Sequence, residues 1–244
     1  MPLAPADYLP HLRRLVAEFE RVLRTADHDA PVKTCGDWRL TDLAVHLGNV
    51  HRWATGMIIT GESIKQDFDK VPDGDLADWY AESAAKLIEA LEAADPADPT
   101  WHFGTSAKIK AFWFRRQTQE IAVHLYDAAT SAGEELVLDP VIAADGVDEV
   151  LTEMLPRVTR WHTPPPLTAS LTLRATDAGT SWHLPAVGEG EVPAVGEDAE
   201  PAATAEGTGQ ELLLMLWQRY PLAKVELGGD TAAATAFLSA RMTP

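Results

Sequence analysis

The chain has 244 residues, of which 46% are hydrophobic and 23% are charged, a composition typical of a folded globular protein. Its formal net charge of −17 at pH 7 excludes nucleic acid and anionic membrane surfaces as expected partners, because both repel an acidic protein. Cys35 is the only cysteine, which excludes an internal disulfide and a thiolate-rich metal site within one chain. The N-terminal stretch has no continuous apolar segment of the kind found in secretory signals and spanning helices, so we expect a cytoplasmic protein.

The first two-thirds of the sequence has the periodicity of helices. Apolar residues recur at helical spacing over residues 7–26, which predicts a first amphipathic helix. A second helix is predicted from about Thr41, whose hydroxyl can cap a helix, to about Thr60, because Gly61 follows as a stop signal. Further helices are predicted over residues 73–94, 106–132 and 140–161. We expect the last of these to pack across the other four.

The pattern changes after the proline-rich segment 163–166. Apolar and polar residues alternate over residues 167–174, as in a half-buried strand. Residues 187–209 are rich in Gly, Pro, Ala and Glu, which predicts a long solvated connection. The other elements predicted in this region are strands at 181–185 and 224–227 and helices at 211–219 and 232–241. The sequence thus predicts a helical domain over residues 1–162 and a small α+β domain over residues 163–244.

Glu120 and His124 stand four residues apart on the predicted fourth helix. Their side chains therefore project from nearly the same face, one turn apart, which suits two ligands of one ion. Apolar residues surround the pair, and a buried glutamate there would need a cation or a proton as compensation. Zinc sites with two histidines and one carboxylate leave a position open for water or substrate. The alternative is an ordinary hydrogen bond on the helix surface.

Two histidines of the predicted second helix compete to be a third ligand. His46 lies in mid-helix among apolar residues and is expected to face the interior. His51 follows five positions later, about 140° around the helix, so both cannot readily address one ion. A core histidine with a backbone hydrogen bond is the alternative interpretation of His46. Spacing by itself leaves the third ligand open.

Several short segments, in the same order and spanning nearly the whole chain, resemble the mycothiol-dependent maleylpyruvate isomerase family. They are residues 34–38, 42–47, 116–127, 144–149 and 214–219. The resemblance implies a DinB-like four-helix bundle followed by a small α+β C-terminal domain. It also implies a divalent metal, which we expect to be zinc, and mycothiol as a thiol cosubstrate.

In that family a histidine of a D-L-x-x-H segment and the glutamate and histidine of an E-x-x-x-H segment bind the metal. These positions fall here on His46, Glu120 and His124. Arg219 falls on an arginine of the family's L-W-x-R segment, which the resemblance implies meets an anionic substrate, and its fork of donors suits a carboxylate. The alternative for Arg219 is a helix-terminal arginine that offsets the helix dipole.

Three more residues are weighed beside these ligands. Asp127 and Arg116 are candidates to orient His124 and Glu120, since metal ligands usually need such support, although ordinary ion pairing is the favoured interpretation of each. Cys35 is not expected to act as a nucleophile, because it lies in a loop and the family's thiol comes from the cosubstrate.

The resemblance implies an enzyme in which the thiol of mycothiol attacks an electrophilic small molecule. An anionic electrophile is one option for this substrate. The product would be either an S-conjugate or a cis-trans isomer, and the metal motif does not separate these. Trp53, Trp113 and Phe112 are candidates to line the pocket, although aromatic residues on bundle helices are more often core. The alternatives are a noncatalytic small-ligand-binding protein with a structural metal or none, and a metal-dependent hydrolase that needs no thiol.

Overall fold

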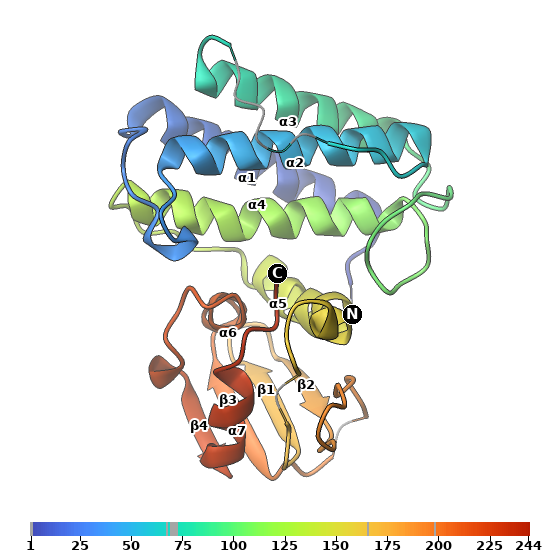
Figure 1. Ribbon diagram of the computed structural model, residues 1–244, viewed down its shortest axis with the longest axis vertical. Coiled ribbons are helices and arrows are strands. Elements are labelled where there is room, and N and C mark those ends of the chain that lie inside the picture. The colour runs from blue at the N-terminus through green and yellow to red at the C-terminus, as the bar shows by residue number, and fades with distance from the viewer. Residues whose placement is uncertain (1, 67, 69–72, 165, 198) are drawn as a thin grey trace. The chain divides into compact units, whose positions relative to one another are not determined.

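The computed structural model divides into two compact units, residues 2–136 and residues 137–244 (Figure 1). It describes residues 2–66, 68, 73–164, 166–197 and 199–244. Met1, Pro165 and Asp198 fall within segments discussed above and lie outside the described residues. None of the helices in the described ranges is both long enough and apolar enough to cross a membrane.

The N-terminal unit is a bundle of four helices. They are α1 (Pro5–Thr25), α2 (Leu40–Thr60), α3 (Leu76–Ala93) and α4 (Ala111–Ser131). Helices α1 and α2 each pack against both α3 and α4, so the four surround one core, as Figure 1 shows. A short 3-10 turn, η1 (Lys33–Cys35), lies in the connection between α1 and α2. This unit matches the predicted bundle.

The bundle core is built from the apolar faces that the helical periodicity predicted. On α1 the buried residues are Tyr8, Leu12, Leu15, Val16, Phe19, Val22 and Leu23. The largest fully buried side chains of the unit include Trp113 of α4 and Tyr80 of α3. Each large apolar side chain buried in this way contributes roughly 1.5–3 kcal/mol relative to an exposed one. The packed core fixes α2 and α4 beside each other.

Helix α2 begins one residue earlier than the predicted cap. The Asp42 carboxylate accepts a hydrogen bond from the backbone N–H of Arg39 at 2.8 Å and secures the first turn. Thr41 does not cap the helix, because its hydroxyl donates to the carbonyl of His28 at 3.0 Å. Gly61 has a φ of 74° and ends the helix, as predicted.

Helix α4 begins at Ala111 rather than near residue 106. The chain before it forms an antiparallel bridge between Pro99 and Ile109, and the Lys110 N–H donates to the carbonyl of Asp98 at 2.9 Å. These bonds prevent the residues before Ala111 from joining helix α4. Further along, α4 is buried on nearly all sides, and its buried residues include the polar side chains Arg116, Gln117, Thr118, Gln119, His124 and Asp127.

The C-terminal unit contains a four-stranded sheet with the order β2-β1-β3-β4. Strands β1 and β3 are parallel, and each outer strand is antiparallel to its neighbour. Helix α6 packs on β1 and β3, and α7 packs on β3 and β4. The strands are β1 (Leu171–Ala175), β2 (Thr180–Leu184), β3 (Ala203–Gly207) and β4 (Glu226–Gly229), and the helices are α5 (Pro140–Glu149), α6 (Gly209–Leu216) and α7 (Thr231–Leu238).

Strand β3 corrects one prediction. It lies within residues 187–209, which we predicted to be a solvated connection, and it occupies an inner position of the sheet. Its Ala203 and Ala205 are fully buried, whereas Thr204 and Glu206 between them are partly exposed. Alanine gives so weak an apolar signal that the alternation is hidden in a segment of strand-poor composition.

The helix predicted over residues 140–161 is also shorter than expected. The α-helix ends at Glu149 and continues as a π-helical turn, η2 (Val150–Met154), and a 3-10 turn, η3 (Leu155–Arg160). Pro156 cannot donate a backbone hydrogen bond, which prevents a regular α-helix there. Within its own unit this helix packs against α6, and its packing across the bundle stays a prediction. The two compact units are divided at 136/137, whereas the sequence predicts domains divided at 162/163.

Candidate metal centre

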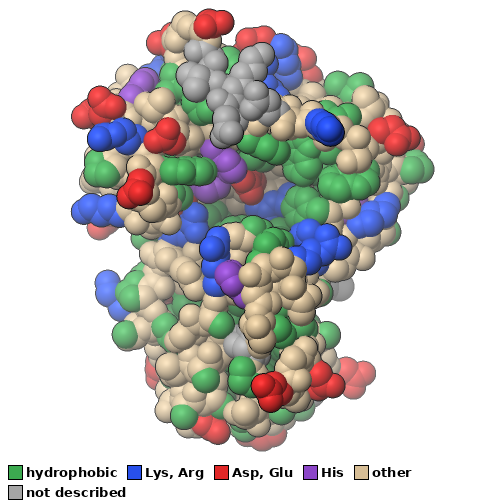
Figure 2. Space-filling model, viewed as in Figure 1, with side chains coloured by type: hydrophobic (Ala, Val, Ile, Leu, Met, Phe, Trp, Pro, Cys, Tyr) green, Lys and Arg blue, Asp and Glu red, His purple; other side chains and the backbone are tan. Residues whose placement is uncertain are grey.

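Two adjacent helices bring the three predicted ligands together. His46 comes from α2, and Glu120 and His124 come from α4, with one potential ligand atom of each within 4.8 Å of the others. The Glu120 Oε1 atom lies 3.4 Å from His46 Nε2 and 3.5 Å from His124 Nε2. In Figure 2, histidine side chains lie beside acidic ones on the helical unit.

These separations fit a small divalent cation. Zinc binds histidine nitrogen and carboxylate oxygen at about 2.0–2.2 Å, so two tetrahedral ligands of one zinc lie roughly 3.4 Å apart. Both pairs that include Glu120 have that separation. The side chains of His46 and Glu120 are 29% and 17% exposed, so the cluster is open to a ligand on one side. The residues present therefore fit the expected metal.

The electrostatics of the cluster keep Glu120 ionised. Burial alone would raise the pKa of Glu120, but hydrogen bonds to His124 and His46 and the charge of Arg116 hold this pKa well below its ordinary range. Burial would lower the pKa of His124, yet its contacts with Asp127, Cys35 and Glu120 outweigh burial and raise the pKa well above the ordinary range. Glu120 is thus held as a carboxylate anion, with the positive charges of His124 and Arg116 beside it.

Arg116 fixes the second oxygen of Glu120. Its Nη2 lies 2.9 Å from Glu120 Oε2, and its side chain is almost fully buried. Since Arg116 holds Oε2, the other oxygen is left facing the two histidine rings. The geometry agrees with the orienting role considered for Arg116 in the sequence.

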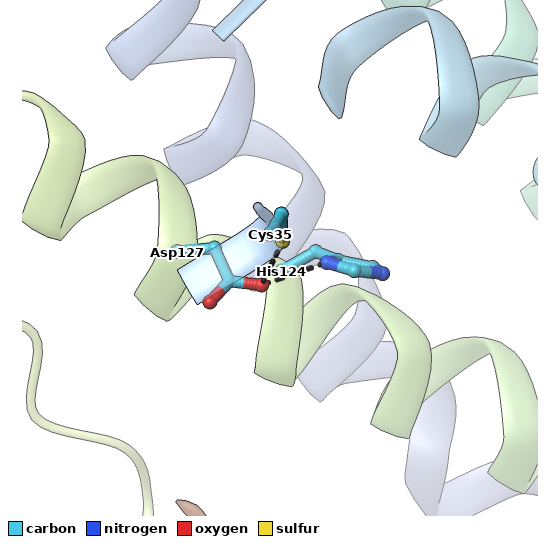
Figure 3. A group of neighbouring side chains, drawn as sticks. All are labelled: Cys35, His124 and Asp127. Carbon is cyan, nitrogen blue, oxygen red and sulfur yellow. Dashed lines mark hydrogen bonds and ion pairs between the residues drawn. The ribbon is translucent and has the colours of Figure 1, made fainter. Parts of the chain in front are cut away.

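Asp127 supports His124 from the opposite side. One of its oxygens, Oδ2, lies 2.9 Å from His124 Nδ1 and 3.5 Å from the Sγ of Cys35. Figure 3 shows the imidazole and the thiol directed at this same oxygen. The Thr34 hydroxyl donates to the other oxygen, Oδ1, at 2.5 Å. The sequence did not predict that Thr34 and Cys35 contact the Asp127 carboxylate, although both residues lie in a segment that carried the family resemblance.

The competing histidine, His51, is not part of the cluster. Its ring is fully buried, and its Nδ1 lies 2.8 Å from the Oε1 of Gln117 on α4. Burial lowers its pKa to about 4, so the ring is neutral at pH 7. Its Nε2 has no hydrogen-bond partner among the described residues. His51 is therefore a core histidine with a side-chain partner.

The remaining candidates are Arg219 and the three aromatic residues. Arg219 belongs to the C-terminal unit and follows α6, where its Nη1 donates to the Trp217 carbonyl at 2.8 Å. That contact fits the helix-terminal alternative. Of the three aromatic candidates, Trp113 and Phe112 are buried core residues, whereas Trp53 is only partly buried and makes an edge contact with Trp113 at 5.4 Å.

Comparisons with known proteins connect the fold and the cluster to one family. The family model described as the mycothiol maleylpyruvate isomerase N-terminal domain matches residues 9–129, and the MDMPI C-terminal domain matches residues 142–236. No curated protein matches the chain.

Two solved structures share the fold over both units. One is a crystal structure of the mycothiol-dependent maleylpyruvate isomerase, with 13% sequence identity to this chain. The other is a crystal structure of a histidine-to-alanine mutant of the mycothiol-dependent maleylpyruvate isomerase, with 12% identity. Each has a TM-score of 0.63 and covers 93% of this chain and 93% of its own. At such low identity the two structures show only that the fold is similar. The family is shown by the two domain matches, one in each unit. The chain belongs to the mycothiol maleylpyruvate isomerase family.

Proposed function

We propose that the protein is a metal-dependent enzyme that uses mycothiol as a thiol cosubstrate to attack an electrophilic small molecule. The observation that carries the proposal is the spacing of His46, Glu120 and His124, which suits one divalent ion, in a chain of this family. Zinc is the metal we propose, because two nitrogen donors and one carboxylate oxygen are a common catalytic zinc set. We place the enzyme in the cytoplasm, where thiols are kept reduced.

The metal, when bound, would lower the pKa of a thiol so that the thiolate is available at neutral pH. The chain's own residues prepare this site. His46, Glu120 and His124 would supply three ligands to the metal, and three protein ligands would leave a further position open. Arg116 holds one oxygen of Glu120 and so keeps the other turned toward the histidines. In this proposal Arg219 binds a carboxylate of the substrate with its fork of N–H donors.

Two reactions use the same nucleophile. In the isomerase version, the thiolate sulfur bonds to one carbon of a conjugated cis double bond, and the π electrons move toward the adjacent carbonyl. Rotation about the new single bond follows, after which the carbon–sulfur bond breaks and the thiolate is regenerated with a trans double bond. In the transferase version, the adduct takes up a proton and leaves as the product. Only the second reaction consumes thiol.

The test is a comparison of turnover with and without mycothiol. Maleylpyruvate and a panel of other conjugated electrophiles are incubated with the zinc-supplemented wild-type protein, and both substrate and free thiol are followed. We expect turnover that requires mycothiol and that falls to the uncatalysed rate in His46→Ala. Constant thiol identifies an isomerase, and consumption of one thiol per turnover identifies a transferase.

Two outcomes would contradict the proposal. Turnover that is equally fast without mycothiol would indicate a hydrolase that activates water. Metal binding, or small-ligand binding, without turnover of any electrophile would indicate a noncatalytic protein. His51→Gln serves as the control for His46→Ala, because it alters a histidine of the same helix that lies outside the cluster.

A further inference from the structure

Asp127 is held more firmly than an ordinary surface carboxylate. It is 1% exposed, and both of its oxygens have partners. Oδ2 accepts hydrogen bonds from the imidazole of His124 and the thiol of Cys35, and Oδ1 accepts one from the hydroxyl of Thr34. The carboxylate therefore cannot rotate without breaking contacts on both sides.

This contact decides which nitrogen of His124 is available. A carboxylate can only accept hydrogen bonds, so His124 Nδ1 must carry the proton that it donates to Asp127. In the neutral ring the lone pair then lies on Nε2. Nε2 is the atom that lies 3.5 Å from Glu120 Oε1, inside the ligand cluster. Asp127 thus presents the correct nitrogen of His124 to the site.

The partners of Asp127 come from a distant part of the sequence. Thr34 and Cys35 belong to η1, in the connection between α1 and α2, whereas Asp127 lies near the end of α4. The Thr34 bond, at 2.5 Å, is the shorter of the two contacts from η1. The turn η1 thereby holds Asp127 of α4, and Asp127 holds the ring of His124.

We propose that Asp127 is a positioning residue that orients His124 for metal binding, and that Thr34 and Cys35 of η1 lock Asp127 in place. This inference rests on the proposed metal centre. The competing explanation is that Asp127 merely anchors η1 to the bundle. The two explanations differ in whether metal affinity, rather than stability alone, depends on the carboxylate.

The experiment measures the zinc dissociation constant of the full chain by competition with a chelator, for wild type and four variants. Asp127→Ala should raise the constant about 10- to 100-fold, the usual effect of losing a carboxylate behind a metal-bound histidine. Asp127→Asn keeps an acceptor for His124 Nδ1 and should restore most of the affinity. Thr34→Val should raise the constant a few-fold. Thr41→Val is the control, because it removes the hydrogen bond from a threonine of α2 to His28 in the same connection, at a site away from Asp127.

A second measurement reports on the ring itself. In the zinc-loaded wild type, the Nδ1–H of His124 should give a slowly exchanging signal in ¹H–¹⁵N NMR spectra, and Asp127→Ala should make its exchange fast. The inference is overturned if folded Asp127→Ala binds zinc as tightly as wild type, or no more weakly than Thr41→Val. A wild-type protein that binds no zinc would overturn the metal centre and this inference together. Zinc binding that depends on Asp127 without any mycothiol-dependent turnover would support the inference and contradict only the proposed function.

Discussion

Single residues carry the electrostatic balance of the candidate metal centre, and the pair Arg116–Glu120 is the clearest case. Arg116 is buried and lies 2.9 Å from Glu120 Oε2. Removal of the arginine takes one cationic partner from a largely buried carboxylate that His124 also contacts, and breaking a buried pair destabilises proteins by roughly 3–5 kcal/mol. We expect Arg116→Met, which keeps the aliphatic bulk, to lower the free energy of unfolding by about 3 kcal/mol in urea denaturation without metal.

Two further measurements, one with added zinc and one on a control variant, test whether the loss comes from the buried pair. Added zinc should recover part of the lost stability, because the ion compensates the charge of Glu120 in place of Arg116. Arg24→Met is the matched control, since Arg24 pairs with Glu20 and Asp78 on the exposed surface and its loss should cost clearly less stability than that of Arg116. Equal losses in the two variants would show that the buried pair contributes no more than a surface pair.

His51 predicts a pH dependence of stability. Burial lowers its pKa in the folded chain to about 4, below its ordinary value of 6.5. Below pH 6.5 the His51 ring therefore binds a proton in the unfolded chain but not in the folded chain. The contribution of neutral His51 to the free energy of unfolding is complete above pH 6.5 and is lost as the pH falls toward 4. The loss should approach about 1.4 kcal/mol per pH unit and total about 3 kcal/mol.

The measurement is the free energy of unfolding of wild type and His51→Gln between pH 7 and pH 4. Glutamine can still bond to Gln117 but does not titrate in this range. The difference between the two proteins isolates His51 from the other titrating groups. Wild type should lose stability relative to the variant as the pH falls, and parallel curves would contradict the buried neutral ring.

The contacts of these residues show which parts of the site could be predicted from sequence. Glu120 and His124 are one helical turn apart, so their shared face follows from spacing alone. His46 was chosen over His51 only by family resemblance, because the direction of both rings depends on how α2 packs against α4. The bond between Thr34 and Asp127 joins residues 93 positions apart, and no local pattern indicates such a contact.

At the scale of elements, the end of strand β4 makes the sharpest prediction. Gly229 has a φ of 64°, and a Cβ atom there would lie 2.1 Å from the carbonyl oxygen of Ala202, just before β3. Gly179 also has a positive φ, of 61°, but a Cβ atom there meets nothing within 4 Å. Both positions impose a left-handed backbone on alanine, at about 1–2 kcal/mol, and only Gly229 adds a clash with backbone.

We therefore expect Gly229→Ala to lower the free energy of unfolding by about 3 kcal/mol or more, and Gly179→Ala by only about 1 kcal/mol. Urea unfolding followed by circular dichroism checks both values. A loss in Gly229→Ala no larger than in Gly179→Ala would mean that β4 does not approach Ala202 as closely as described.

Elements with a strong period were the predictable ones. The apolar stripe of α1 matched the structure, because it repeats over several turns. The alternation over residues 167–174 predicted a strand, but β1 begins only at Leu171, and Thr172 on its polar side is buried. Strand β3 was missed because only alanines mark its buried side. The change from α-helix to π and 3-10 turns after Glu149 was also missed, since it depends on how the chain accommodates Pro156 in the folded unit.

At the scale of the molecule, the acidic charge and the two matched domains together favour a small-molecule enzyme. The net charge of −17 opposes polyanionic partners. Lys and Arg side chains are scattered among acidic and apolar ones on the face shown in Figure 2. Each unit corresponds to one domain of the family, and the metal ligands all lie in the N-terminal unit, whereas Arg219 lies in the C-terminal one.

The metal centre is the claim on which the proposed chemistry depends, and the zinc content of the purified chain tests it most directly. After zinc loading and removal of free metal, elemental analysis should find about one zinc ion per wild-type chain. His46→Ala should lose most of this zinc, and His51→Gln should retain it. A wild-type protein without zinc, or a His46→Ala variant that retains it fully, would contradict the site built from His46, Glu120 and His124.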